Sequence, residues 1–264
     1  MEFGNQVWLV SGASSGIGLQ VGLALRARGA RVAFAARGAD RLRTLVAAST
    51  AGAPREIAVP LDVTDDVSVR DGVRTVLGAF GRIDGLVNMA GNGGALQRWD
   101  AAGGTHLREM FEVHVFGAER MARAVVPAMR RQGVGTIVNI ASTVAWVPMP
   151  GAAAYSAAKA AVVSWSGALR AELEGTGIDV RVFAPPHTRT EAGVRWPLPL
   201  PRIFEPDWVA QQLLRSLQQG SPLSLPGGNR PLLWLQRLSP TLATRLMNRI
   251  GFSALQRAQE HAGG

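Results

Sequence analysis

Short apolar segments alternate with longer helical patterns along most of the chain. Val7–Val10 and Gly85–Asn88 are typical of the apolar segments, and each is too short to be a helix. Antiparallel strands can be joined by a tight turn, whereas parallel strands need a longer crossover, usually a helix. The alternation therefore predicts an α/β fold, a single doubly wound parallel sheet with helices on both faces. The expected strands are 7–10, 31–36, 56–59, 85–88, 136–140 and 179–183, with helices after 18 and 64, at about 40–49 and 105–131, and around 155–159.

The composition fits one globular domain and excludes several kinds of site. The chain has 264 residues, 47% of them hydrophobic, and no linker-like stretch. It has no cysteine and only four scattered histidines, so we expect no disulfide and no metal site. No apolar run reaches the ~18 residues that cross a bilayer, and the first residues do not resemble a secretion signal. We therefore expect a cytoplasmic protein.

The net charge of +9 indicates an anionic partner. The partner could be nucleic acid, a membrane surface or a phosphate-bearing cofactor. Arginine is spread along the whole chain, and no basic run is interleaved with aromatic residues. Nucleic acid is therefore not expected.

A glycine-rich loop follows the first expected strand. Gly12, Gly16 and Gly18 let the backbone approach a ligand closely, and the helix after them presents free N–H groups to a phosphate. Folds of this type bind nucleotides at such a loop. At the end of the second strand an acid would bond a ribose 2′-hydroxyl, but the chain has Arg37, which fits a 2′-phosphate. We therefore expect NADP(H) rather than NAD(H), the alternative being that Arg37 is a solvated cation.

The single tyrosine of the chain, Tyr155, and its single lysine, Lys159, stand four positions apart. On a helix this spacing places both side chains on one face. Every other cation among the 28 Lys and Arg residues is Arg, which indicates that the one lysine has a chemical role. A nearby ammonium stabilises a phenolate, so we expect Lys159 to lower the pKa of Tyr155 from its ordinary value near ~10.

These motifs together resemble those of the short-chain dehydrogenases/reductases. The glycine loop, Asn88–Gly91, Ser142 and Tyr155-x-x-x-Lys159 occur in the family's order between about Val7 and Thr190. The resemblance implies a Rossmann-type domain, a nicotinamide cofactor and hydride transfer at a carbonyl or hydroxyl carbon. We expect this domain to span 1–228, with a substrate flap at about 186–205, and 229–264 to be a helical extension of the same domain.

The resemblance also implies a role for each matching residue. Tyr155 is expected as general acid/base, Ser142 as the residue that polarises the substrate oxygen, and Lys159 as the residue that lowers the tyrosine pKa and bonds the nicotinamide ribose. Asp62 is expected near the adenine. The full set of expected cofactor-binding residues is Gly12, Ser14, Ser15, Gly16, Ile17, Gly18, Arg37, Asp62, Val63, Asn88, Ala90, Gly91, Tyr155, Lys159, Pro185, Thr188 and Thr190.

The chain departs from the family pattern at three positions. His114 stands where the family usually has an asparagine that holds a water in a proton path to the lysine. A neutral imidazole can also donate and accept hydrogen bonds, so His114 either takes the place of that asparagine, relays protons itself as a catalytic residue with an ordinary pKa near ~6.5, or is a hydrogen-bonded structural residue. Pro186 replaces a glycine and removes an N–H beside the nicotinamide. Ser11 replaces a threonine and keeps its hydroxyl.

Bulky apolar residues surround the expected catalytic residues in the sequence. Trp146 and Met149 lie between Ser142 and Tyr155, and Trp196 begins an apolar stretch after Thr190. Few groups in these segments can bond a carboxylate or sugar, so we expect a lipophilic small-molecule carbonyl or alcohol as substrate. The alternative is that these side chains only pack a flap onto the body.

The C-terminal segment has the pattern of a basic amphipathic helix. Leu242, Leu246 and Ile250 form an apolar stripe beside Arg245 and Arg249. Such a helix packs on its own body or on a sister subunit, which we favour, or lies peripherally on an anionic membrane. We expect a homodimer or homotetramer.

Together these patterns predict an NADP(H)-dependent oxidoreductase, a ketoreductase or alcohol dehydrogenase. An epimerase of the same fold and an NADP(H)-sensing scaffold without turnover are the alternatives. The intact set of Ser142, Tyr155 and Lys159 argues against the scaffold.

Overall fold

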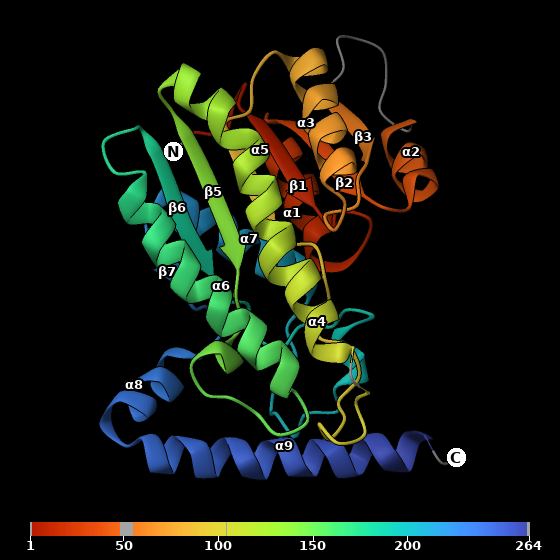
Figure 1. The fold of residues 1–264 in the computed structure, drawn as a ribbon, viewed down its shortest axis with the longest axis vertical. Coiled ribbons are helices and arrows are strands. Elements are labelled where there is room, and N and C mark those ends of the chain that lie inside the picture. Colours follow the sequence, from red (N-terminus) through yellow and green to blue (C-terminus); the bar gives the residue numbers. More distant parts are fainter. Residues whose placement is uncertain (1, 48–54, 104, 263–264) are drawn as a thin grey trace.

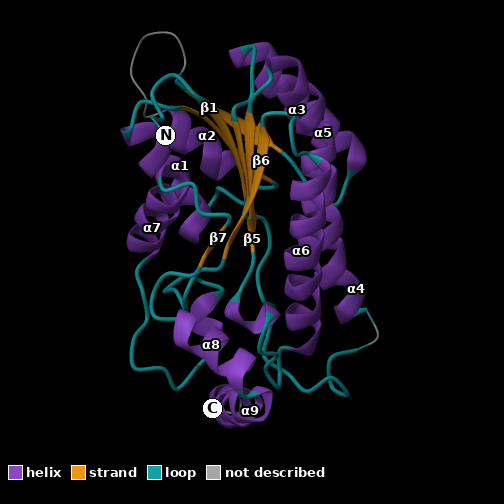
Figure 2. Cartoon of the chain, turned by 90° about the vertical axis from the view of Figure 1, so that its left-hand side faces the viewer, coloured by secondary structure: helices purple, strands orange, loops and turns teal. Residues whose placement is uncertain are grey.

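The computed structural model describes residues 2–47, 55–103 and 105–262. At its centre is a seven-stranded sheet, ordered β3-β2-β1-β4-β5-β6-β7, in which all neighbouring strands are parallel. Helices cover both faces of this sheet (Figure 2), which confirms the expected doubly wound fold. The strands are β1 Val7–Ser11, β2 Arg31–Ala36, β3 Glu56–Pro60, β4 Gly85–Asn88, β5 Gly135–Ile140, β6 Ile178–Phe183 and β7 Leu223–Ser224, the last of which the sequence analysis did not predict.

The helices follow the expected pattern with one interruption. A π-helical turn, Glu112–Phe116, divides the predicted helix at 105–131. The end of the helix predicted at 40–49 lies outside the described residues. The helices are α1 Gly16–Ala27, α2 Ala39–Ala47, α3 Asp66–Phe80, α4 His106–Phe111, α5 Gly117–Gln132, α6 Ala153–Glu172, α7 Pro206–Gln218, α8 Arg230–Leu238 and α9 Pro240–Ala262, with 3-10 turns at Thr143–Ala145 and Gly193–Arg195.

Two hydrophobic layers sandwich the sheet. Trp8 and Val10 of β1 point to the layer that includes α1 and α7, whereas Val7 and Leu9 point to the layer that includes α3 and α5. Alternate residues of a strand face opposite sides, so a strand covered on both sides must be apolar throughout. This explains why β1 reads as an unbroken apolar run.

The strand order reverses at the centre of the sheet. β1 has β2 on one side and β4 on the other, so the loops that leave the carboxyl ends of β1 and β4 diverge and leave a crevice between them. Helices α8 and α9 lie beyond the carboxyl ends of β5 and β6, with α9 running across that end of the molecule (Figure 1). The crevice and the C-terminal helices are therefore at the same end of the sheet.

Candidate active site

A cleft of about 810 Å³ opens at the carboxyl ends of β1 to β4. The loops after these four strands form most of its wall. The expected cofactor-binding residues that line it are Gly12, Ser14, Ser15, Gly16, Ile17, Gly18, Arg37, Asp62, Val63, Ala90, Gly91 and Thr190. Further lining residues, which the sequence analysis did not single out, are Ala36, Gly38, Leu61, Thr64, Met89, Asn92, Met110, Val113, Glu191, Ala192 and Arg195.

The glycine loop is folded tightly against the end of β4. Gly12 has a φ of +65°, and a Cβ at this position would lie 2.8 Å from the Cα of Ala90. A Cβ at Gly18 would lie 2.4 Å from the carbonyl oxygen of Gly12. Neither glycine can be replaced without moving the backbone. The loop leads directly into α1, whose N-terminus is bordered by the cleft and provides N–H groups suited to an anion.

The Ser11 hydroxyl fixes the other side of the crevice. It accepts hydrogen bonds from the backbone N–H groups of Met89 (3.1 Å) and Ala90 (3.2 Å) and lies 3.3 Å from the Val87 carbonyl oxygen, to which it donates. These bonds join the end of β1 to the chain that leaves β4. The Ser11 hydroxyl therefore holds the end of β1 and the segment after β4 together.

Arg37 and Asp62 stand at one end of the cleft. Burial raises the pKa of the Asp62 carboxyl, but hydrogen bonds from Thr64 and the charge of Arg37 outweigh it, so the net pKa is lowered. The Thr64 hydroxyl and backbone N–H both donate to Asp62 Oδ1, at 2.8 and 2.9 Å. Asp62 is therefore a fixed anion beside an exposed arginine.

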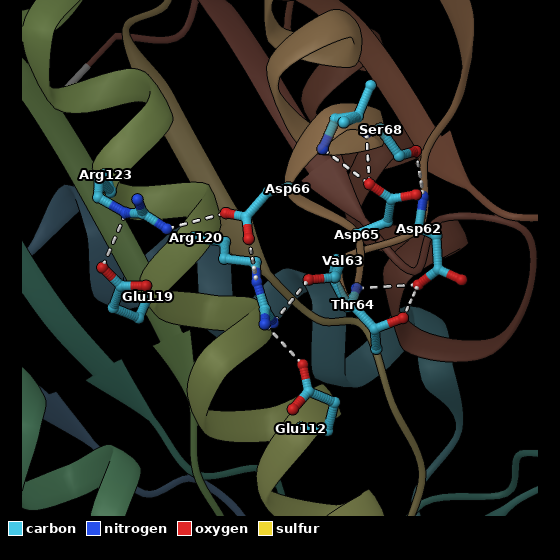
Figure 3. Close-up of polar contacts among 11 residues, drawn as sticks. Asp62, Val63, Thr64, Asp65, Asp66, Ser68, Glu112, Glu119, Arg120 and Arg123 are labelled. Carbon is cyan, nitrogen blue, oxygen red and sulfur yellow. Dashed lines mark hydrogen bonds and ion pairs between the residues drawn. The ribbon is translucent and has the colours of Figure 1, made fainter.

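An ion-pair network ties this end of the cleft to the π-helical turn (Figure 3). Arg120 of α5 pairs with Glu112 at 2.7 Å and with Asp66 at 3.4 Å, and its guanidinium also reaches the Val63 carbonyl at 3.5 Å. Glu112 is the first residue of the π-helical turn, and Asp66 is the first residue of α3. These contacts thus fix the position of the loop that carries Asp62 relative to the π-helical turn that carries His114.

A second pocket, of about 280 Å³, continues from the cleft. Both are lined by Ile17, Met89, Gly91, Asn92, His114, Thr190 and Ala192, so they form one connected space. The walls of this pocket bring together the expected residues Ser142, Tyr155, Lys159, Pro185, Thr188, Met149 and Trp196. The prediction for Trp146 is wrong, because this side chain lies outside the pocket lining and packs against the clusters around Val144 and Val182.

Tyr155 is held between two aromatic rings. Its ring makes edge contacts with His114 and Trp196, at centroid distances of 5.3 and 5.4 Å. The Trp196 indole N–H donates to the Gly94 carbonyl at 2.9 Å, which fixes the orientation of that ring. Desolvation raises the pKa of Tyr155 to about 12, and a hydrogen bond with the Ser142 hydroxyl opposes this rise.

The expectation that Lys159 lowers the pKa of Tyr155 is not met in this arrangement. The Lys159 ammonium lies 5.5 Å from the centroid of the phenol ring and donates to the Ile140 carbonyl at 2.6 Å. Burial lowers the pKa of Lys159 itself to about 7, so near neutral pH its charge is only partly present. The group that favours the phenolate here is Ser142.

His114 is a neutral residue in this site. Burial and the nearby charge of Lys159 lower the pKa of its imidazole to about 3. An imidazole with this pKa stays uncharged near neutral pH, which favours the expected roles in which His114 does not change its charge. Its Nε2 lies 2.9 Å from the Asn92 carbonyl, which can only accept, so this nitrogen carries the proton and donates. Its Nδ1 is a buried acceptor without a partner in the described structure.

A cavity of about 10 Å³ lies behind the site, lined by Asn88, His114 and Lys159. Asn88 donates its amide N–H to Asn139 Oδ1 at 2.8 Å, and Asn139 in turn donates to the Ser166 hydroxyl at 2.9 Å. The remaining Asn88 oxygen is buried without a protein partner among the described residues, like His114 Nδ1. The cavity is therefore polar and close to the size that holds one water molecule.

The C-terminal helices complete the pocket wall. Leu232 of α8 and Met247 and Ile250 of α9 line the same pocket as the expected catalytic residues. The sequence analysis identified the stripe that contains Ile250 but did not connect it to this site. Arg195, a second cation of the cleft, was also missed, because a single loop arginine carries no recognisable signal.

Comparisons with known proteins agree with this geometry. Residues 6–197 match the family model described as short chain dehydrogenase. An 11-beta-hydroxysteroid dehydrogenase from Pinus massoniana is 34% identical over 68% of the chain, which spans half the length of that relative.

Two solved structures of similar proteins contain nicotinamide nucleotides. A short chain dehydrogenase from Burkholderia cenocepacia in complex with NADP has a TM-score of 0.81 at 28% identity, covering 94% of this chain and 100% of that chain. A 3-ketoacyl-(acyl-carrier-protein) reductase from Brucella melitensis complexed with NADH has a TM-score of 0.76 at 28% identity, covering 81% of this chain and 91% of that chain.

The burial of Lys159 predicts a pH-dependent cost to stability. Its pKa falls from 10.5 to about 7 on folding, so between these values the unfolded state binds more protons, and the free energy of unfolding rises with pH. Lys159→Met keeps the apolar stem of the side chain and removes the cost of burying an amine that is charged in the unfolded state. We expect the variant to be more stable than the parent at pH 7, with the difference shrinking as the pH rises toward about 9.5. Denaturant unfolding of both proteins across this range measures it, and a difference independent of pH would contradict the burial cost.

Proposed function

The chain belongs to the short-chain dehydrogenase/reductase family, and on that premise we propose that it is an NADP(H)-dependent oxidoreductase. Its substrate is a lipophilic ketone or aldehyde and the corresponding alcohol. The observation that carries the proposal is the connection of the two pockets, one bordered by the glycine loop and the other by Ser142, Tyr155 and Lys159. A nucleotide in the first would extend its nicotinamide end toward the phenol in the second.

The residues of the cleft suit a dinucleotide with an extra phosphate. The glycine loop and the start of α1 fit a pyrophosphate, and Arg37 and Arg195 offer two exposed cations beside the single anion Asp62. When bound, a nicotinamide cofactor supplies or accepts the hydride. The protein positions the substrate carbon and controls the proton on the substrate oxygen.

Tyr155 serves as the proton donor to that oxygen. With its pKa raised to about 12, the phenol stays protonated through the neutral range, which suits a general acid in the direction of carbonyl reduction. The Ser142 hydroxyl, which donates to the phenol oxygen in this structure, turns its single proton to the substrate oxygen when the substrate binds and stabilises the charge that develops there. The reverse reaction needs the phenolate, so oxidation of the alcohol gains rate as the pH rises.

The proton is replaced through the cavity behind Lys159. Lys159 lies beside both Tyr155 and this cavity, and with a pKa of about 7 it can both give and take a proton at neutral pH. The free acceptors of Asn88 and His114 hold a water next to its ammonium. In this role His114 positions the water without becoming charged.

The character of the pocket supports a lipophilic substrate. Val144, Met149, Trp196, Leu198 and Leu232 supply apolar walls, which suit a substrate with a large apolar surface. The names of the relatives, a steroid dehydrogenase and a ketoacyl reductase, are consistent with carbonyl groups on large apolar frames.

The alternatives differ from this proposal in a measurable way. An epimerase would change its substrate without net consumption of NADPH, and a sensing scaffold would bind the nucleotide without turnover. Ser142, Tyr155 and Lys159 converge on one apolar pocket, which is what a hydride-transfer enzyme needs and a scaffold does not.

Tyr155→Phe tests the acid/base role. The substitution removes the transferable proton and keeps the ring between His114 and Trp196. We expect turnover to fall by about 10²-fold or more, with cofactor affinity within a few-fold of the parent. Ketone reduction followed by NADPH absorbance and cofactor titration by fluorescence measure the two effects. A variant that retains turnover within about tenfold of the parent would exclude Tyr155 as the proton donor.

Arg37→Ala tests the cofactor preference. We expect NADPH to bind the parent more tightly than NADH, and Arg37→Ala to remove most of that difference. A charge-assisted bond to phosphate contributes about 1.5–3 kcal/mol, or roughly tenfold to a hundredfold in affinity. Arg43→Ala is the matched control, because Arg43 is an exposed arginine that pairs with Asp40, and neither residue lines the cleft. Equal NADPH and NADH affinities in the parent would reject the preference.

Substitutions at His114 test the water-holding role. His114→Asn keeps a buried acceptor and should retain activity within a few-fold, whereas His114→Ala should lose about tenfold or more. Because the pKa of His114 is about 3, the pH profiles of the parent and His114→Asn from about pH 5 to 9 should superimpose after normalisation. Thermal unfolding of all three proteins separates a catalytic loss from instability. An inflection present in the parent and absent from His114→Asn would show that the imidazole titrates during turnover.

A further inference from the structure

The two C-terminal helices have an inner and an outer face. The inner face of α9 places Ala243, Met247, Ala254 and Leu255 against the residues around Met149. The expected stripe is therefore only partly right: Ile250 joins this packed side, but Leu242 and Leu246 do not. The neighbouring residues Ala243 and Met247 pack against the body of the protein instead, and Leu242 and Leu246 remain exposed.

Large apolar side chains are exposed on both helices. Leu238 is 81% exposed, Trp234 60%, Phe252 54%, Leu242 52% and Leu246 44%. On α9, Leu242, Leu246 and Phe252 belong to the side of the helix opposite the packed residues. Both views of the molecule put α9 at its outer end, with no other element beyond it (Figures 1 and 2).

The same segment of the chain is strongly basic. Residues 229–264 contain five arginines and a single acid, Glu260. Arg245 and Arg249 are exposed beside Leu242 and Leu246, and no ion pair within the described ranges joins either of them to an acid. Arg237 lies over the ring of Trp234, 5.7 Å from its centroid. Exposed tryptophan, leucine and arginine side by side suit an interface between water and an anionic apolar phase.

We propose that the outer face of α8 and α9 binds the surface of an anionic lipid bilayer. The arginines bind the headgroups, and the exposed leucines, Phe252 and Trp234 enter the boundary of the acyl chains. A second copy of this chain fits less well, because a two-fold contact through this face would bring Arg245 and Arg249 of both copies together. No helix in the described ranges is long and apolar enough to cross a membrane, so binding is at the surface.

The inner face of the same helices connects membrane binding to the proposed substrate pocket. Leu232, Met247 and Ile250 line the apolar pocket while their neighbours on the outside face the bilayer. A lipophilic substrate dissolved in the membrane would meet the protein at the wall of its pocket. This consequence rests on the proposed function, but the binding itself does not.

Vesicle co-sedimentation tests the proposal on the full chain. We expect binding to vesicles of phosphatidylcholine and phosphatidylserine in equal parts, little binding to phosphatidylcholine alone, and loss of binding at high salt. The double variants Arg245→Gln/Arg249→Gln and Leu242→Gln/Leu246→Gln should each bind about tenfold more weakly or worse. Arg130→Gln/Arg131→Gln is the matched control, because these exposed arginines end α5 at the opposite end of the molecule (Figure 1).

Two results would overturn the proposal. One is equal binding of the parent and both α9 variants to the mixed vesicles, and the other is no binding by the parent. Light scattering on the same proteins tests whether a second copy of the chain covers this face instead. If the parent is a dimer that does not bind vesicles, and Leu242→Gln/Leu246→Gln is a monomer, the face belongs to a second copy. Circular dichroism spectra and thermal unfolding midpoints that match those of the parent show that the variants are folded without any use of NADPH, so failure here is distinct from failure of the proposed enzymatic function.

Discussion

The parallel pairing of β1 with both β2 and β4 is the constraint on which the site depends. It forces the chain to leave β1 and β4 in opposite directions and so creates the crevice that the glycine loop borders. The close approach of Gly12 to Ala90, and the bonds of the Ser11 hydroxyl to the same segment, hold that crevice at a fixed width. Every residue of the cleft is positioned relative to this junction.

Burial sets the chemistry at the other end of the crevice. The same apolar surroundings raise the pKa of Tyr155 and lower that of Lys159. The phenol therefore stays protonated, and the pKa of the lysine comes close to neutral pH. Two buried acceptors beside Lys159, on Asn88 and His114, have no protein partner in the described part of the chain. Features that cost stability are thus concentrated where proton transfer would take place, as is usual at functional sites.

The sequence predicted the sheet, its parallel strands and about half of the residues that line the cleft, because each of these left a local signal. Apolar runs marked the strands, and Gly12, Gly16 and Gly18 marked the loop. The π-helical turn around His114, the pKa directions at Tyr155 and Lys159, and the exposure of Leu242 and Leu246 could not be predicted. Each depends on which distant elements pack together, and neighbouring positions of one amphipathic pattern can exchange places at such contacts. Trp146 was misplaced for the same reason: proximity in sequence to Ser142 does not determine which side of the segment faces the pocket.

Above all, we propose that the protein transfers hydride between a nicotinamide nucleotide in the cleft and a lipophilic carbonyl in the adjoining pocket. Mass spectrometry of the product is the most direct test, after incubation with NADPH deuterated at the transferred position and a panel of lipophilic ketones and aldehydes. The account predicts one deuterium on the carbinol carbon of the product for each NADPH oxidised. Conversion of substrate without label and without net NADPH oxidation would identify an isomerising enzyme, and tight NADPH binding with no product from any of these carbonyls would contradict the account.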